Sequence, residues 1–145
     1  MSKQCLDVHQ MQHLQELGLE LKETMLYWAR CVDNNPRAAT HYGKWVLIKG
    51  NNAQTVGLMH WEFIPAYTLQ DVLDALPKDI SKDGCTWYAS LYIDFENNRI
   101  AYGNTDRYGF EIYHEIMIEK DLIDAAYSML CWAIENKFVE TNKNE

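Results

Sequence analysis

The segment Asp121–Glu135, DLIDAAYSMLCWAIE, decides the fold of this chain. Its spacing predicts a helix, and between Leu122 and Ile134 only Asp124 and Ser128 are polar. A helix on a protein surface needs a wide polar face, which this segment lacks. The segment is also too short, and too often interrupted by polar residues, to span a membrane. We therefore expect a core helix that is covered on at least two faces.

The predicted helix carries two apolar stripes. One stripe is suited to packing on a sheet and comprises Ile123, Ala126, Tyr127, Leu130 and Ile134. The other lies roughly a third of a turn away and comprises Leu122, Met129 and Trp132. Either a second helix of the chain covers this other stripe, or a second subunit does, because a two-fold dimer uses the same patch on both chains. Trp and Met are enriched at interfaces, so we favour a homodimer with Trp132 at or near its interface.

Shorter elements are predicted before this helix. Apolar alternation and turn residues predict strands at Thr24–Val32, Lys44–Lys49, Thr55–Phe63, Thr86–Phe95, Arg99–Tyr102 and Phe110–Ile116. One helix is predicted over His9–Leu17, and another runs from Thr68 to Pro77, where Thr68 and Asp71 form a capping box. Short polar turns join the strands, which favours antiparallel neighbours.

Together these elements predict a single α+β domain over residues 1–145. We expect one antiparallel sheet of about five to six strands, packed by the long apolar C-terminal helix and a second, shorter helix. Residues 1–8 and 140–145 are predicted to be frayed, and Lys78–Gly84 is predicted to be a polar loop. The residues expected to be buried together between sheet and helix are Trp87, Leu91, Ile93, Leu130 and Ile134.

Composition and charge restrict the class of partner. Hydrophobic residues make up 48% of the chain and charged residues 23%, which is typical of globular proteins rather than disordered ones. The net charge is −8, and the Lys and Arg residues are scattered. Binding to nucleic acid normally requires a basic patch that neutralises phosphates. We therefore expect no nucleic-acid partner.

The N-terminal sequence MSKQCLDVHQMQHLQ contains no apolar run. We accordingly expect no secretory signal and no membrane partner, and a cytoplasmic location. Because that compartment is reducing, disulfides are not expected among the four cysteines. These are Cys5, Cys31, Cys85 and Cys131.

Three groups of residues are candidates for chemical sites. Cys5, His9 and His13 share a helical spacing that suits part of a metal site. They lack an evident fourth ligand, so we predict no bound metal. His60 and Glu62 form a His–carboxylate pair on a strand, and a solvent-facing pair is the favoured interpretation. The neighbours His114 and Glu115 are a weaker candidate, because consecutive strand residues point to opposite faces. With no nucleophile, phosphate-binding or metal motif in the sequence, we predict no catalytic residue and no cofactor.

An aromatic strand face is the most interesting candidate for binding. Tyr88 and Tyr92 share one face of a predicted strand, and Tyr102, or Ile100, is expected beside them across the hairpin. Tyrosine rings suit interfaces and flat stacking pockets. The alternative is cross-strand aromatic pairing that only stabilises the sheet.

Three segments resemble small uncharacterised proteins of phages, prophages and mobile elements of Bacteroides-type gut bacteria. They are Gln10–Leu19 (QMQHLQELGL), Phe63–Leu73 (FIPAYTLQDVL) and Asp121–Asn136 (DLIDAAYSMLCWAIEN). The resemblance implies an intracellular accessory protein and brings no active site with it. One departure is Lys137, where the resemblance implies glycine after Asn136, and it puts the predicted left-handed cap at Asn136 in doubt.

The leading hypothesis is a non-enzymatic interaction protein, associated with a phage or mobile element, that binds a host or phage protein or itself. The rival is a protein that binds or sequesters a small signalling metabolite, and the third is a small enzyme without a recognisable motif. A pocket with two or more Arg or Lys residues beside Tyr or Trp would favour the metabolite binder. A wide apolar patch without such a pocket would favour the interaction protein.

Overall fold

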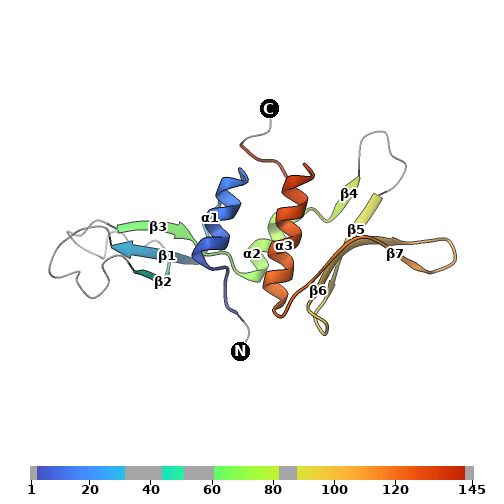
Figure 1. The fold of residues 1–145 in the computed structure, drawn as a ribbon, viewed down its shortest axis with the longest axis horizontal. Helices are drawn as coiled ribbons and strands as arrows, with labels where there is room; N and C mark the ends of the chain where they lie inside the picture. The colour runs from blue at the N-terminus through green and yellow to red at the C-terminus, as the bar shows by residue number, and fades with distance from the viewer. Residues whose placement is uncertain (1–2, 32–43, 51–60, 82–87, 143–145) are drawn as a thin grey trace.

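The computed structural model of the chain describes residues 3–31, 44–50, 61–81 and 88–142. The described residues form three helices and seven strands. In chain order these are α1 (Val8–Glu16), β1 (Leu26–Cys31), β2 (Trp45–Lys49), β3 (Trp61–Pro65), α2 (Leu69–Ala75), β4 (Asp79–Ser81), β5 (Tyr88–Asp94), β6 (Arg99–Thr105), β7 (Glu111–Ile118) and α3 (Leu122–Glu135). The class is therefore α+β, with the helices lying between two groups of strands (Figure 1).

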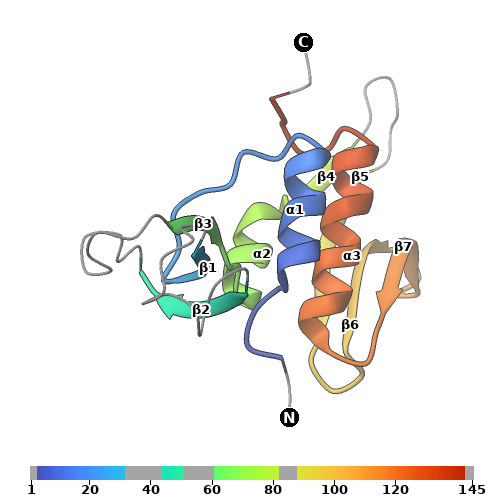
Figure 2. The same ribbon diagram turned by 60° about the vertical axis from the view of Figure 1, so that its left-hand side comes forward.

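The strands form two antiparallel sheets, so the prediction of one sheet is wrong. The three-stranded sheet has the order β2-β1-β3, and the four-stranded sheet has the order β4-β5-β6-β7. In both views the helices separate the two sheets (Figures 1 and 2). The physical reason lies in α3, which has no wide polar face and must be covered from more than one side. Strands on one side and helices on the other provide that cover.

One hydrophobic cluster links the helices to both sheets. Leu14 of α1, Val72 of α2, Leu130 of α3 and Ile100 of β6 belong to it and are completely buried, and Ile64 of β3 belongs to it at 5% exposure. Leu91 and Ile93 are partly buried against the same cluster, as predicted, whereas Trp87 lies outside the described residues. The sheet and α3 therefore share one core.

The second stripe of α3 is covered within the chain. Met129 is fully buried, so the prediction that it lies at a subunit interface is wrong. The ring of Trp132 lies 6.0 Å from that of Tyr102 and 5.5 Å from that of Phe138, between centroids. Leu122 is partly buried against the same core. The chain's own strands and C-terminal segment thus contact this stripe.

A non-glycine residue ends α3 in the left-handed conformation. Lys137 has φ of +66°, whereas Asn136 has φ of −94°, so the predicted left-handed cap is one residue later than expected. The Phe138 amide donates to the Ala133 carbonyl at 2.8 Å, and the Lys137 amide donates to the Ile134 carbonyl at 3.0 Å. These two bonds are those of a Schellman motif. The motif turns Phe138 back onto Trp132.

Residues 3–8, the described part of the N-terminal segment predicted to be frayed, are held against the core. Cys5 and Leu6 are buried. The Leu6 amide donates to the Tyr67 carbonyl at 2.8 Å, and the indole of Trp28 donates to the Leu6 carbonyl at 2.8 Å. At the other end, the Asn142 amide donates to the Gly18 carbonyl at 2.8 Å. Backbone bonds therefore fix both ends of the described chain.

Strand β4 was missed because the sequence around it is polar. Asp79 and Ser81 are exposed, and only Ile80 between them is buried. Backbone pairing to β5 and a 2.6 Å bond from the Ser90 hydroxyl to the Asp79 carboxylate hold it in place. A three-residue edge strand has too little periodicity to stand out from a loop. No helix in the described part of the chain is long and apolar enough to cross a lipid bilayer.

Candidate binding surface

The four-stranded sheet has an apolar face that points away from the helices. The strand register places Tyr92 opposite Ala101, and Ala101 opposite Ile116, so these residues share one face. The same register aligns Arg99 with Ile118. We call this surface the outer sheet face; its large apolar residues are Tyr88, Tyr92, Tyr113, Ile116 and Ile118. None of these five belongs to the hydrophobic cluster under α3.

The outer sheet face is largely open to solvent. Tyr88 is 60% exposed and Ile118 is 65% exposed, while Tyr92 and Ile116 are 39% and 37% exposed. Of the nine exposed large apolar side chains in the described residues, eight lie between Tyr88 and Ile118. The ninth, Met25, lies beside the three-stranded sheet. Exposed apolar surface is therefore concentrated on the four-stranded sheet and its loops.

Tyr102 does not lie on this face, which corrects the predicted aromatic group. It pairs with Leu91 rather than with Tyr92, and its side chain is completely buried under α3. Its hydroxyl donates to the Pro77 carbonyl at 2.6 Å. Burial, and secondarily the charge of Asp79, raises the pKa of Tyr102 and keeps the hydroxyl protonated. Its predicted alternative, Ile100, is also fully buried.

Tyr113 takes the place on the outer sheet face that was predicted for Tyr102. Its ring meets that of Tyr92 edge-on, with centroids 6.4 Å apart and an interplanar angle of 90°. The Arg99 guanidinium lies 5.4 Å from the Tyr113 ring centroid and 3.3 Å from a carboxylate oxygen of Asp94. The Tyr113 hydroxyl donates to Glu111, and this bond raises the pKa of Tyr113. A cation, two rings and two carboxylates thus meet on one sheet face.

A glycine and a β-bulge position the Tyr113 ring. The register of β6 and β7 shifts between Tyr102 and Gly103, and Gly103 then lies opposite Tyr113. A Cβ atom on Gly103 would lie 2.4 Å from the Ile112 carbonyl oxygen and 2.8 Å from a Tyr113 ring carbon. Only glycine allows the two strands to approach this closely.

The outer sheet face is hollowed next to these rings. The hollow has a volume of about 390 Å³. It is lined by Tyr92, Ile93, Asp94, Phe95, Glu96, Arg99, Ala101, Glu111 and Tyr113. Three of these residues are acidic and one is basic. A neutral or cationic group therefore suits the hollow better than an anion does.

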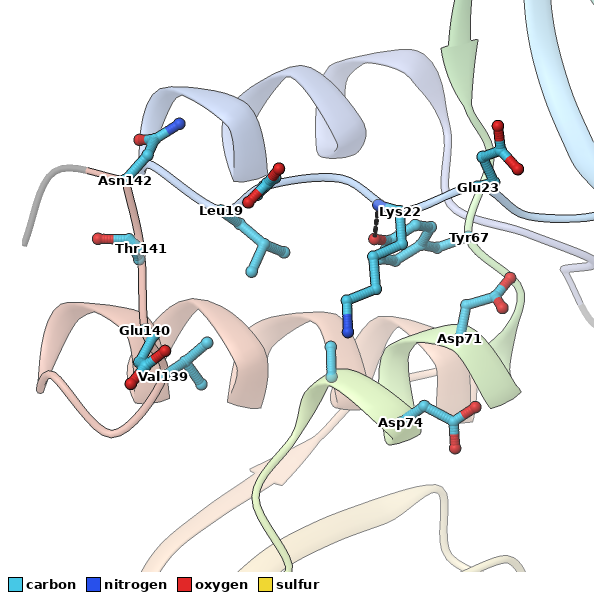
Figure 3. Close-up of a pocket in the computed structure, with 12 residues that line it drawn as sticks. Leu19, Lys22, Glu23, Tyr67, Asp71, Asp74, Val139, Glu140, Thr141 and Asn142 are labelled. Atoms are coloured by element: carbon cyan, nitrogen blue, oxygen red, sulfur yellow. Dashed lines mark hydrogen bonds between the residues drawn. The ribbon is translucent and has the colours of Figure 1, made fainter.

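A second hollow, of about 610 Å³, lies between the segment after α1, helix α2 and the C-terminal segment (Figure 3). Asp71 and Asp74 project from α2 on one side of it, and Glu140 lies on the other side. With Glu20 and Glu23 in addition, five carboxylates line the hollow against the single ammonium of Lys22. The Tyr67 hydroxyl accepts a 2.8 Å bond from the Lys22 amide. Neither hollow offers the two cations beside an aromatic ring that an anionic metabolite would need.

The structure does not bring Cys5, His9 and His13 together. Cys5 is buried in a small cluster with Leu26 and Ala66, whereas His9 is exposed. His13 lies with its ring 6.4 Å from that of Tyr127. Among the described residues, no three His, Cys, Asp or Glu side chains are grouped closely enough to hold a metal ion. The helical spacing of these three residues therefore does not bring their side chains into one group.

Of the other two candidate pairs, the structure describes only His114 and Glu115 in full. His60 lies outside the described residues, and Glu62 forms an ion pair with Arg30. His114 is exposed, whereas Glu115 is partly buried opposite Tyr102. Cys5 and Cys131 are free thiols, and burial raises the pKa of both.

Sequence reasoning missed Arg99, Tyr113, Ile116 and Ile118 as parts of one surface. The signal was present in EIYHEIMI of β7, where apolar residues occur at both odd and even positions. A strand with one solvated face alternates between apolar and polar residues, so apolar residues on both faces indicate a second covered surface. No protein-family model, curated protein or solved structure matches this chain.

Proposed function

We propose that this chain is a non-enzymatic interaction protein that binds a protein partner through the outer sheet face. The observation that carries the proposal is the exposure of four large apolar side chains on this one sheet face, namely Tyr88, Tyr92, Ile116 and Ile118. Large apolar patches on soluble proteins mark interaction sites. The face also contains three tyrosines, which are enriched at protein interfaces.

Further properties belong to the same proposal. The resemblance to proteins of phages and mobile elements supports a host or phage protein as the partner and the cytoplasm as the place of action. The homodimer predicted through Trp132 gains no support from the burial of Met129.

The proposal is tested by a quantitative pull-down from a lysate of a bacterial host of the kind that the resemblance implies. The bait carries Ile116→Thr and Ile118→Thr together, which removes apolar surface but keeps β-branched residues in β7. The control is Met25→Thr, because Met25 is 77% exposed but adjoins β1 of the three-stranded sheet. We expect captured proteins to be lost with the double variant and kept with the control. Equal capture by both variants would contradict the proposal.

A second candidate function is binding of a cationic small molecule in the hollow of Figure 3. Its support is the five carboxylates that line this hollow against one ammonium group. Spermidine is a suitable probe, and isothermal titration calorimetry measures its binding. Binding that is lost in Asp74→Asn with Glu140→Gln would favour this function. Absence of heat at millimolar spermidine would remove it.

A further inference from the structure

We infer that the partner inserts an Arg or Lys side chain, flanked by apolar residues, into the hollow between Tyr92, Tyr113 and Glu111. This inference rests on the proposed function, because it names the chemistry of the partner that the outer sheet face would bind. It depends on the charges that line the hollow, on the aromatic rings within it, and on the apolar residues around it.

The hollow carries an excess of negative charge. Its lining contains Asp94, Glu96 and Glu111 against Arg99, which gives one positive and three negative charges, or −2. Arg99 and Asp94 already form an ion pair at 3.3 Å. The remaining carboxylates are Glu96 and Glu111, and Glu111 accepts the Tyr113 hydroxyl bond. A carboxylate has room for several donors, so Glu111 retains acceptor capacity for a cation.

The aromatic rings of the hollow favour a cation as well. A ring face attracts a guanidinium or ammonium group within about 6 Å of its centroid. Arg99 already lies over Tyr113 in this manner, at 5.4 Å. Tyr92, which stands perpendicular to Tyr113, is 39% exposed and lines the same hollow. A partner cation placed against Tyr92 would therefore meet both a ring and the carboxylate of Glu111, which has remaining acceptor capacity.

The chain segment that forms β5, β6, β7 and their loops is also negatively charged as a whole. From Tyr88 to Lys120 the chain has six carboxylates and three cationic side chains, a net charge of −3. The carboxylates are Asp94, Glu96, Asp106, Glu111, Glu115 and Glu119, and the cations are Arg99, Arg107 and Lys120. Like charges across an interface are strongly unfavourable, so an acidic partner, a nucleic acid or a second acidic copy of this face is disfavoured. A cationic protein segment is favoured.

The apolar residues around the hollow indicate that its ligand is larger than a small cation. Ile116 and Ile118 lie on β7 beside the rings, and Tyr88 lies further along β5. These side chains would stay exposed around a free amine or guanidine. A peptide or protein segment that places apolar residues next to its Arg or Lys covers them. In typical protein interfaces an anchor residue enters a pocket, and the apolar residues around the pocket are covered by the partner.

Selection from a random 12-residue peptide display library against the full chain tests the inference. Enriched peptides are synthesised, and their affinities are measured by fluorescence polarisation at low and high salt. Glu111→Gln removes a charge but keeps an acceptor for the Tyr113 hydroxyl, Tyr92→Thr removes a ring, and Met25→Thr is the control. Circular dichroism confirms that each variant is folded before its affinity is compared.

We expect the enriched peptides to contain Arg or Lys among apolar residues. Tyr92→Thr should weaken them by about 30-fold, as for an interface hot spot. Glu111→Gln should weaken them by about two- to five-fold, as for a partly exposed ion pair. High salt should weaken binding to the wild type, and Met25→Thr should change nothing.

Two other outcomes separate the inference from the proposed function. Neutral or acidic peptides whose binding is lost in Tyr92→Thr would overturn the cationic anchor but leave the outer sheet face as a protein-binding surface. Peptides that bind every variant equally, or an absence of any enriched peptide, would overturn both.

Discussion

The two faces of the four-stranded sheet are similar in sequence but different in environment. The inner face presents Leu91, Ile93, Ile100, Tyr102 and Met117 to the core. The outer sheet face presents Tyr88, Tyr92, Tyr113, Ile116 and Ile118. Both faces contain aliphatic and tyrosine side chains, yet only the inner face has α3 against it. Hydrophobicity therefore identifies surfaces that need cover, and the position of the helix decides which surface is covered within the chain.

The largest effect on stability is expected when a core side chain that packs on the inner face is shortened. Leu130 is fully buried on α3. Leu130→Ala should lower the free energy of unfolding by about 2–5 kcal/mol, through lost burial and a residual cavity. Urea unfolding followed by tryptophan fluorescence gives the value. A loss below about 1 kcal/mol would mean that α3 does not pack on the sheet at this residue.

Removing a hydroxyl from a tyrosine on each face compares the stability contributions of the two faces directly. Tyr102→Phe removes the donor to the Pro77 carbonyl and should cost about 1–2 kcal/mol, because a partly buried acceptor loses its partner. Tyr92→Phe removes a hydroxyl from an exposed side chain and should leave stability unchanged. Parallel urea melts of the two variants measure the difference. Equal effects would contradict the assignment of the two residues to opposite faces.

The carboxylate of Asp124 links α3 to the N-terminal segment and to α1. Asp124 accepts bonds from Lys3 and from Gln10, both at 2.9 Å. Burial alone would raise its pKa, but the bonds from Gln10 and Lys3 outweigh burial and lower the pKa of Asp124. With a lowered folded pKa, its stabilisation is present above the unfolded pKa of about 3.9 and is lost as the pH falls through the folded value.

Asp124→Asn should therefore cost about 1 kcal/mol at pH 7, and this cost should shrink as the pH falls from about 5 to 3. Urea melts across that pH range provide the measurement. The control is Asp74→Asn, because Asp74 accepts from Gln70 on the exposed side of α2. A constant difference between wild type and Asp124→Asn at every pH would show that the charge of Asp124 does not stabilise the fold.

A substitution at the C-terminal end of α3 is expected to raise the stability of the fold. Lys137 holds φ of +66°, which costs a non-glycine residue roughly 1 kcal/mol. Lys137→Gly should therefore raise stability by about that amount, seen as a higher melting temperature. Glu135→Gly, two residues earlier and inside the helix, should lower stability by about 1 kcal/mol. A destabilising Lys137→Gly would show that this lysine has another role.

The smallest stability effect is expected on the outer sheet face. Ile118→Thr should change the free energy of unfolding by less than about 0.5 kcal/mol, since its side chain is 65% exposed. Its neighbour Met117 packs against the core, so Met117→Thr should cost more than about 1 kcal/mol. The two substitutions compare the two faces within one strand. A larger cost at Ile118 would place that residue in the core.

The sequence was sufficient to predict local features. The Thr68 capping box is confirmed by the Thr68 amide bond to Asp71 at 2.9 Å and by the Asp71 amide bond to the Thr68 hydroxyl at 3.3 Å. Helix α3 occupies Leu122–Glu135, within the predicted segment. Asn98, in the short polar turn between β5 and β6, has φ of +51°, a conformation that asparagine tolerates. All three depend on residues close together in the chain.

Features that depend on register or on distant partners were not predictable. The hairpin aligns Asp94 with Arg99, so even-numbered residues of β5 face odd-numbered residues of β6. A shift of one residue would have placed Tyr102 beside Tyr92, as the sequence suggested. Neither alternation nor composition fixes that choice. The division into two sheets likewise depends on where the helices lie, which no single segment encodes.

Gly103 has a consequence for how this protein can vary through evolution. Any side chain at this position would collide with the Ile112 carbonyl, so substitution there would separate β6 from β7 and displace Tyr113. The exposed residues around it carry no such steric restriction and can diverge as a partner diverges. A distant descendant of this chain is therefore expected to retain a glycine in its central strand while the tyrosines and isoleucines around it are replaced.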